Sequence, residues 1–287
     1  MDDRQYMTFH PAGILVPLIT PFTDDDELER HAQTVIDDGA SGIVALGTTG
    51  EASSLNPDER SQVVDVCASV CRQRSVPLIV GAGSNNTRST LTELETLAAT
   101  AEVDAALTVV PYYVRPSEDG VVAHFEFLAD RSPIPLILYN VPYRTGQALG
   151  ADAILRLVEH PNIVGIKQAV GAVDYDTARL IAARPEQFSI LAGEDALVSP
   201  LLAMGADGAI LGTANVLTRE FAALYDLWRA GHVERAQDVG DNLVEPALAL
   251  MAAPNPVTIK SELHDLRRIG TPNVRLPLLS TRHSRAG

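Results

Sequence analysis

The chain has 287 residues, 46% of them hydrophobic, which is enough to bury a large core and is a usual size for a single α/β barrel. Its formal net charge is −15, and no run of Lys and Arg occurs that would bind phosphates, so nucleic acid is not expected as a partner. The sequence has no stretch of about 18 apolar residues and no targeting pattern at its start. We therefore expect a cytoplasmic protein that does not enter a membrane.

Short apolar runs recur eight times along the chain, and each is followed by an amphipathic stretch with helical spacing. The runs occupy residues 13–20, 41–47, 77–83, 105–111, 135–141, 163–170, 188–193 and 208–214. Repeats of this kind, with strands apolar on both faces, predict parallel strands that are covered by helices and closed into a (β/α)8 TIM barrel. An open, doubly wound sheet is the alternative.

The alternation stops after residue 230, where GHVERAQDVGDNLVEPALALMAA and NPVTIKSELHDLRRIG predict additional helices. No linker or low-complexity stretch separates them from the repeats. We therefore predict a catalytic barrel over residues 1–230 and a helical appendage of the same domain over residues 231–287. Cys67 and Cys71 lie one helical turn apart without further ligands nearby, so we expect buried, reduced thiols and not a metal site.

Reactive side chains of such a barrel lie at the carboxyl ends of its strands. The candidates there are Thr48 and Thr49 after the second strand, Tyr112 and Tyr113 after the fourth, Tyr139 and Arg144 at the fifth, Lys167 in the sixth and Gly193 after the seventh. No histidine occupies these ends. The carboxylates Glu51, Glu194 and Asp195 are scattered in the sequence, so neither a metal nor another cofactor is expected.

Lys167 stands in the apolar stretch IVGIKQAVG, although an ammonium group is rarely buried. An amine kept neutral by burial attacks a carbonyl carbon and forms a Schiff base, whose protonated nitrogen acidifies the neighbouring C–H. Tyr139 and Thr49 supply hydroxyls that can relay the protons of this reaction, and Arg144 supplies a planar fork suited to a carboxylate. The set predicts Schiff-base chemistry on an acidic carbonyl substrate.

Each candidate also has a structural interpretation. Lys167 can pair with a carboxylate inside the barrel, Thr48 and Thr49 can cap the following turn, and tyrosines at strand ends are often core residues with a wet hydroxyl. Arg144 can form a surface ion pair, and Gly193 can serve a turn. A non-catalytic barrel that binds or senses a 2-oxo acid is therefore the alternative to an enzyme, although mere binding does not require a buried nucleophile.

The motifs GTTGE, YNVPYRTG, GIKQAVG, GED and NPVTIK resemble, in order and spacing, the dihydrodipicolinate synthase family of pyruvate-dependent class I aldolases. The resemblance covers almost the whole chain. It implies a lyase that condenses pyruvate with L-aspartate-4-semialdehyde in lysine and diaminopimelate biosynthesis, and a homotetramer built from tight dimers. The arginine of YNVPYRTG and the double threonine favour this family over N-acetylneuraminate lyase. The segments ASSL and ILGTANV depart from the family pattern and leave another aldehyde as the alternative.

The resemblance also implies a role for each site residue. Lys167 forms the Schiff base with pyruvate, Tyr139 donates and accepts the proton, and Thr49 links Tyr139 to Tyr113. The tyrosine at the position of Tyr113 reaches in from a neighbouring subunit, so a dimer is the smallest complete unit. The remaining expected contacts are Thr48 with the pyruvate carboxylate, Arg144 with the aldehyde's carboxylate, and the backbone of Gly193 and Ile210 with the pocket.

Many members of the family are inhibited by lysine, which binds in a cleft at the dimer interface. The positions that match its binding residues are Asn85, Tyr112, Ser89, Pro57 and Arg60. A dicationic amino acid would meet Arg60 there and would find no carboxylate at position 89, so it would lose its charge-assisted hydrogen bonds. We therefore expect weak or absent inhibition by lysine, unless Glu93, one helical turn further on, replaces the missing carboxylate.

Overall fold

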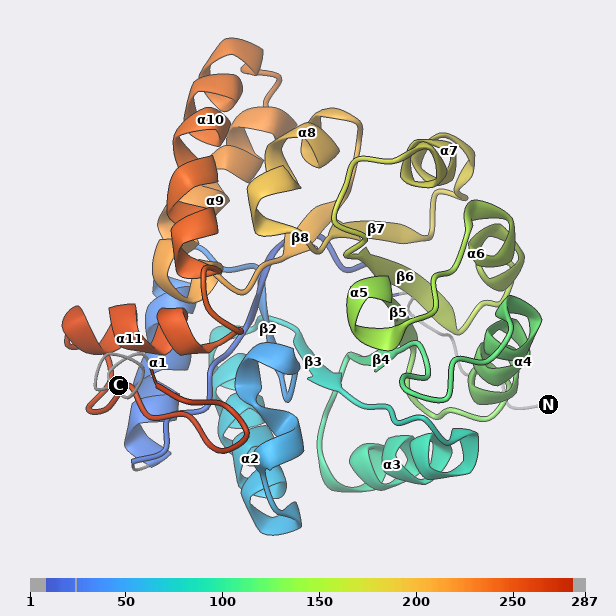
Figure 1. Cartoon of the computed structure of the whole chain (residues 1–287), viewed down its shortest axis with the longest axis horizontal. Coiled ribbons are helices and arrows are strands. Elements are labelled where there is room, and N and C mark those ends of the chain that lie inside the picture. The colour runs from blue at the N-terminus through green and yellow to red at the C-terminus, as the bar shows by residue number, and fades with distance from the viewer. Residues whose placement is uncertain (1–8, 24, 281–287) are drawn as a thin grey trace.

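The computed structural model describes residues 9–23 and 25–280, which form a closed barrel of eight parallel strands (Figure 1). The strands are β1 Gly13–Pro17, β2 Gly42–Ala45, β3 Leu78–Gly81, β4 Ala105–Val109, β5 Leu136–Asn140, β6 Ile163–Gln168, β7 Ser189–Ala192 and β8 Gly208–Ile210. Each strand pairs with the next, and β1 pairs with β8, with Leu15 opposite Ile210. The predicted (β/α)8 barrel is confirmed, and the open sheet is excluded.

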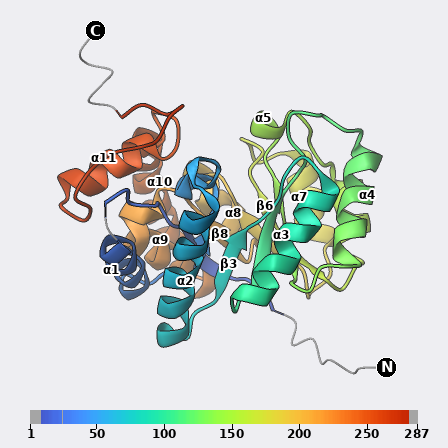
Figure 2. The same ribbon diagram turned by 90° about the horizontal axis from the view of Figure 1, so that it is seen from below.

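Helices surround the strands in both views (Figures 1 and 2). They are α1 Asp25–Asp37, α2 Pro57–Arg74, α3 Thr87–Thr100, α4 Glu118–Ala129, α5 Pro142–Thr145, α6 Ala151–Leu157, α7 Tyr175–Ala183, α8 Val198–Ala203, α9 Ala214–Arg229, α10 Val233–Leu250 and α11 Val257–Asp265. Side-chain caps fix several starts: Asn56 and Glu59 form a capping box at α2, and Ser117 and Asp174 cap α4 and α7. The loops that precede the helices are thereby held at the carboxyl end of the barrel.

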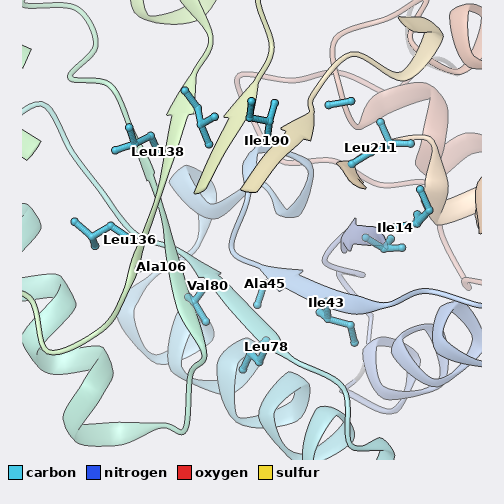
Figure 3. Packing of buried hydrophobic residues seen from close by; sticks show 14 of the residues in the cluster. Ile14, Ile43, Ala45, Leu78, Val80, Ala106, Leu136, Leu138, Ile190 and Leu211 are labelled. Carbon is cyan, nitrogen blue, oxygen red and sulfur yellow. The ribbon is translucent and has the colours of Figure 1, made fainter. Parts of the chain in front are cut away.

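The alternation of side chains along each strand divides the core into two parts. Residues such as Ile14, Ile43 and Leu138 face the helices and belong to the outer cluster shown in Figure 3. Residues on the other face of the strands fill the barrel interior; they include Leu15, Ile79, Leu107, Ile137, Tyr139, Leu191 and Ile210. The register places Lys167 between Tyr139 on β5 and Leu191 on β7, so its side chain belongs to the interior.

The segment after residue 230 forms α10 and α11, which lie on one side of the barrel: α10 packs against α8 and α9, and α11 packs against α9 and α10 (Figure 1). The domain boundary at residue 230 stays a prediction. Cys67 and Cys71 are buried and free, as expected, and burial raises the pKa of Cys71 to about 12. Within the described part of the chain, no helix is long and apolar enough to span a bilayer.

Candidate active site

A cavity of about 40 Å³ lies at the carboxyl end of the strands, and six of the eight predicted site residues line it. These are Thr48, Thr49, Tyr139, Arg144, Lys167 and Gly193. A larger cleft of about 320 Å³ adjoins it and shares Thr48, Tyr139 and Arg144 as lining residues. These six residues lie between positions 48 and 193, a span of 146 residues, and they meet at one cavity that opens to the surface through the cleft.

Lys167 is 8% exposed, and its Nζ lies 4.6 Å from the centre of the Tyr139 ring. Among residues 9–23 and 25–280, no carboxylate oxygen lies within 4.0 Å of this amine. The structural interpretation of Lys167, an ion pair that stabilises the barrel, is therefore not realised. Its amine faces the cavity beside a phenol, which suits a nucleophile that needs a nearby proton donor.

The chain has only two lysines among its 22 Lys and Arg residues, and the second is Lys260 on α11. Lys260 is fully buried, and its Nζ donates to Glu51 Oε1 at 2.5 Å and to the carbonyl oxygen of Asn273 at 2.9 Å. Burial lowers the pKa of Lys260 to about 8, and the Glu51 carboxylate opposes that shift. The two lysines are thus chemically different: one is ion-paired, and the other is not.

The turn that carries the threonines is a short 3-10 helix, η1 Thr48–Gly50. Thr49 is 2% exposed, and its Oγ1 accepts a hydrogen bond of 3.0 Å from Asn255 Nδ2, whereas Thr48 is exposed at the cavity. Neither hydroxyl caps this helix, so the structural interpretation of the threonines as capping residues is not supported. Glu51, which follows the turn, adopts a left-handed conformation with φ 52°.

Arg144 lies on α5, directly after β5, and is exposed in the wall of both cavities. Its guanidinium carbon stacks 4.8 Å from the centre of the Tyr143 ring. In the described ranges, Arg144 has no carboxylate partner, so the alternative of a surface ion pair is not realised either. A guanidinium held by an aromatic face, without an anion of its own, is suited to bind a carboxylate from solution.

Two carboxylates line the same cavity as Lys167: Asp195, the first residue of η3 Asp195–Leu197, and Glu194, directly before it. Asp195 is buried, and its Oδ1 accepts hydrogen bonds of 2.6 Å from both the amide and the hydroxyl of Thr213. Burial raises the pKa of Asp195, and burial together with Asp195 raises the pKa of Glu194. Over the described residues, no group of three or more His, Cys, Asp and Glu side chains is arranged to hold a metal ion.

Tyr113 and Ile210 are the two predicted residues that do not line the cavity. Ile210 is fully buried in the barrel interior, and the wall is formed instead by Gly212, two residues later. Tyr113 is 86% exposed, has φ 70°, and is the centre of a tight turn in which Val114 N donates to Tyr112 O at 2.8 Å. A left-handed, exposed tyrosine costs conformational energy without a benefit inside its own chain.

Two of the cavity residues that were not predicted come from the C-terminal segment and not from the strand ends. Met251 and Asn255 line the cavity from the segment between α10 and α11. Lys260 was also unassigned, although the spacing of Val257, Lys260 and Leu263 on one buried face of α11 marks it as a charge in an apolar stripe. That periodicity was one available signal, and the motif NPVTIK, which begins at Asn255 and ends at Lys260, was another.

Of the five positions expected at the inhibitor cleft, Tyr112 and Arg60 line the larger cleft. Glu93 lines the larger cleft, whereas Ser89 lies outside its wall near the start of α3. The Glu93 carboxylate forms an ion pair with Arg60 and accepts a hydrogen bond of 2.9 Å from the amide of Gly83. Glu93 is therefore placed to replace the missing carboxylate, but its charge is already neutralised.

A buried lysine without an ion-pair partner, beside a tyrosine at the carboxyl end of a (β/α)8 barrel, is the arrangement of a lyase of the class I aldolase type. The profile of the Dihydrodipicolinate synthetase family matches residues 10–286. The chain belongs to this family, and the resemblance seen in its motifs is confirmed.

Relatives and solved structures agree with this assignment. The chain is 38% identical to the 4-hydroxy-tetrahydrodipicolinate synthase of Methanopyrus kandleri, over 96% of this chain and 93% of the relative. It is 39% identical to that of Neisseria gonorrhoeae, over 93% and 92%. The dihydrodipicolinate synthase of Acinetobacter baumannii, solved with pyruvate, superposes with a TM-score of 0.89 at 36% identity, over 94% and 93%. A monomeric dihydrodipicolinate synthase variant gives a TM-score of 0.90 at 29% identity, over 94% and 91%.

Proposed function

We propose that this protein is a 4-hydroxy-tetrahydrodipicolinate synthase, which condenses pyruvate with L-aspartate-4-semialdehyde in lysine and diaminopimelate biosynthesis. The observation that carries the proposal is the amine of Lys167, buried beside Tyr139 and without a carboxylate partner among the described residues. The names of the relatives and the pyruvate-bound neighbour support the substrates. A cytoplasmic location stays a prediction from the sequence.

The chemistry begins with attack of the neutral Lys167 amine on the ketone carbon of pyruvate. A proton is delivered to the ketone oxygen, and the carbinolamine then loses water to give the protonated Schiff base. The iminium withdraws electrons from the adjacent methyl group, so a base can remove a methyl proton and leave an enamine. The enamine carbon then bonds to the aldehyde carbon of the second substrate, and the aldehyde oxygen takes a proton to become the hydroxyl group. The amino group of the second substrate next attacks the imine carbon and displaces the Lys167 amine, which closes the ring and frees the lysine. Tyr139, whose ring lies against the amine, is the proposed donor and acceptor of these protons.

The other site residues bind and orient the substrates. Thr48 is exposed at the cavity and is the proposed ligand of the pyruvate carboxylate. Thr49 lines the same cavity as Tyr139 and is the proposed link between Tyr139 and Tyr113 in the proton relay. Arg144 has no carboxylate of its own among the described residues and is the proposed ligand of the aldehyde's carboxylate. The backbone of Gly193, together with Gly212 in place of Ile210, is the proposed lining for pyruvate. The adjoining cleft gives the second substrate a path from solvent to the amine.

Tyr113 is the proposed contribution of a second subunit. Its ring is 86% exposed and its backbone is held in a strained turn, which suits a side chain that enters a neighbour's site. Such an exchange would complete the relay from Tyr139 through Thr49 to the partner's tyrosine. We therefore propose tight dimers that assemble into a homotetramer.

Reduction with borohydride in the presence of pyruvate tests the function, and the composition of the chain makes the result simple to interpret. Only Lys167 and Lys260 carry side-chain amines, so peptide mapping has two candidates besides the N-terminus. We expect one reduced pyruvate on Lys167, no adduct on Lys260, and no adduct in Lys167→Arg, because Arg stays protonated. An adduct confined to other amines, or none at all, contradicts the Schiff-base mechanism.

Turnover of pyruvate with a panel of aldehydes, measured beside the trapping assay, distinguishes the synthase from another aldolase and from a barrel that only binds a 2-oxo acid. A synthase turns over L-aspartate-4-semialdehyde with pyruvate faster than other aldehydes of similar size, and a different preference assigns the chain to another pyruvate-dependent aldolase. A binding or regulatory barrel gives no turnover with any of them.

A further inference from the structure

The turn that carries Thr48 and Thr49 is held from outside the barrel by the segment that contains α11. Asn255 donates to Thr49 Oγ1 at 3.0 Å, and Lys260 donates to Glu51 Oε1 at 2.5 Å. Both contacts join positions more than 200 residues apart in the chain. Within the turn, Gly50 N donates to Gly47 O at 3.0 Å and Glu51 N donates to Thr48 O at 3.2 Å, and Thr20 Oγ1 donates to Gly50 O at 2.8 Å; these bonds fix the backbone, whereas the bonds from Asn255 and Lys260 hold the side chains of Thr49 and Glu51.

Glu51 needs such support because it is strained. Its φ is 52° and ψ is 35°, a left-handed conformation that is unfavourable for a residue with a side chain, because its Cβ approaches the following carbonyl oxygen. The preceding Gly50 is confined as well, since a Cβ there would lie 3.1 Å from the carbonyl oxygen of Leu18. A strained residue persists only where its surroundings fix it, and here the fixed residue directly follows the two threonines.

Both oxygens of the Glu51 carboxylate accept hydrogen bonds. Oε1 accepts from Lys260, and Oε2 accepts from the backbone amide of Arg275 at 2.9 Å. Lys260 uses its remaining donors on the carbonyl of Asn273 and on the face of Phe22, whose ring centre is 3.8 Å away. The position requires a compact cation with diverging donors, which explains a lysine in a chain where 20 of the 22 Lys and Arg residues are arginines.

We propose that Lys260 is a positioning residue for pyruvate: by holding Glu51, it fixes the 48–51 turn so that Thr48 and Thr49 reach the cavity beside Lys167. The inference rests on the proposed function, because it assigns the threonines to pyruvate. It gives the C-terminal helices a direct part in the reaction, in addition to covering the barrel.

The test compares Lys260→Met, Glu51→Gln and the double variant. Each single change leaves a buried charge or dipole without its partner, so we expect a lower thermal midpoint and a fall of roughly 10-fold to 100-fold in kcat/KM for pyruvate. The double variant removes both charges and should recover most of the thermal midpoint. Its kcat/KM for pyruvate should stay as low as in the single variants, because methionine has no N–H to donate to residue 51 and so does not fix the turn. The KM for the aldehyde, which depends on Arg144, should change little.

Arg184→Met is the matched control. Arg184 forms a half-buried ion pair with Asp207 at 2.8 Å, at the amino end of β8 and away from the cavity. We expect it to lower the thermal midpoint without changing kcat/KM for pyruvate. A double variant that recovers both stability and kcat/KM, or an Arg184→Met variant that loses pyruvate turnover to the same degree, overturns the positioning role. Borohydride trapping of the parent separates the two proposals: an untrapped parent refutes the Schiff base, whereas a trapped parent with an active double variant refutes only the role of Lys260.

Discussion

Gly193 allows Lys167 to occupy its place, and replacing it with Ala tests how closely the site is packed. A Cβ at position 193 would lie 2.7 Å from the Cβ of Ala169, 3.0 Å from the carbonyl oxygen of Gln168 and 3.0 Å from Cε of Lys167. All three atoms belong to β6 or the residue that follows it. The amide of Gly193 also donates to Gln168 O at 2.9 Å, which keeps the new methyl group from moving away.

The contacts decide the size of the effect. Two of the three atoms are backbone or a Cβ and cannot move alone, whereas Lys167 Cε belongs to a flexible chain. We therefore expect the lysine to give way. Overpacking of this kind costs about 1–3 kcal/mol of stability. Displacement of the nucleophile by a fraction of an ångström to 1 Å lowers the rate of adduct formation by roughly 10-fold to 100-fold.

The assay is the rate of pyruvate trapping by borohydride, measured with the thermal midpoint. Gly47→Ala is the matched control, because Gly47 lines the same cavity but its new Cβ would meet Pro17 and Val44 at ordinary distances of 3.6 and 3.8 Å. We expect Gly47→Ala to retain most of the rate. If Gly193→Ala formed the adduct as fast as the parent, the close packing of Gly193 against Lys167 would have no bearing on its reactivity.

Further predictions concern the proton relay, the second substrate, stability at acidic pH and regulation. Tyr139→Phe should lower kcat by about 10²-fold to 10⁴-fold, and Arg144→Ala should raise KM for the aldehyde while pyruvate trapping persists; an unchanged aldehyde KM would count against aspartate semialdehyde. Burial lowers the pKa of His31 to about 4 in the folded state, so the unfolded chain binds more protons between about pH 6.5 and 4 and stability falls as the pH falls through that window. In urea titrations between about pH 6.5 and 4, the free energy of unfolding of His31→Gln should fall less than that of the parent, by up to about 3 kcal/mol. An equal fall in the two proteins would show that His31 is not responsible for the loss. Lysine should inhibit turnover weakly or not at all, because Glu93 is neutralised by Arg60, and half-inhibition at submillimolar lysine would show otherwise.

The barrel could be predicted because its physical cause is local. Strands buried on both faces must be apolar at every position, and each is followed by a helix whose apolar stripe covers it. The ends of the strands could be predicted less well, because apolar residues also continue into the following loop. The last apolar run, 208–214, was expected to be one strand, yet β8 ends at Ile210. The next three residues, 211–213, lead into α9, which begins at Ala214, and an apolar run alone does not show where extended backbone stops.

Most of the site could also be predicted, because a rule of geometry connects it to the sequence. Parallel strands in a barrel end on the same face, so polar residues at those ends converge even when they are far apart in the chain. Met251 and Asn255 reach the same cavity from the C-terminal helical segment, to which that rule does not apply. Their positions depend on how α10 and α11 pack onto the barrel, which no local pattern determines.

The two lysines show where the sequence alone is insufficient. Both Lys167 and Lys260 lie in apolar surroundings and are buried, so the sequence offers each as a nucleophile or as half of an ion pair. Glu51 distinguishes the two lysines: it lies 209 residues from Lys260 in the sequence and forms an ion pair with Lys260 but not with Lys167. The amine of Lys260 is held in place by its bond to the Glu51 carboxylate, whereas the amine of Lys167 forms no ion pair among the described residues and faces the cavity, where it can meet a carbonyl carbon. The chemical role of each lysine therefore follows from a tertiary contact, and removing that contact from Lys260 should disturb the site without creating a second nucleophile.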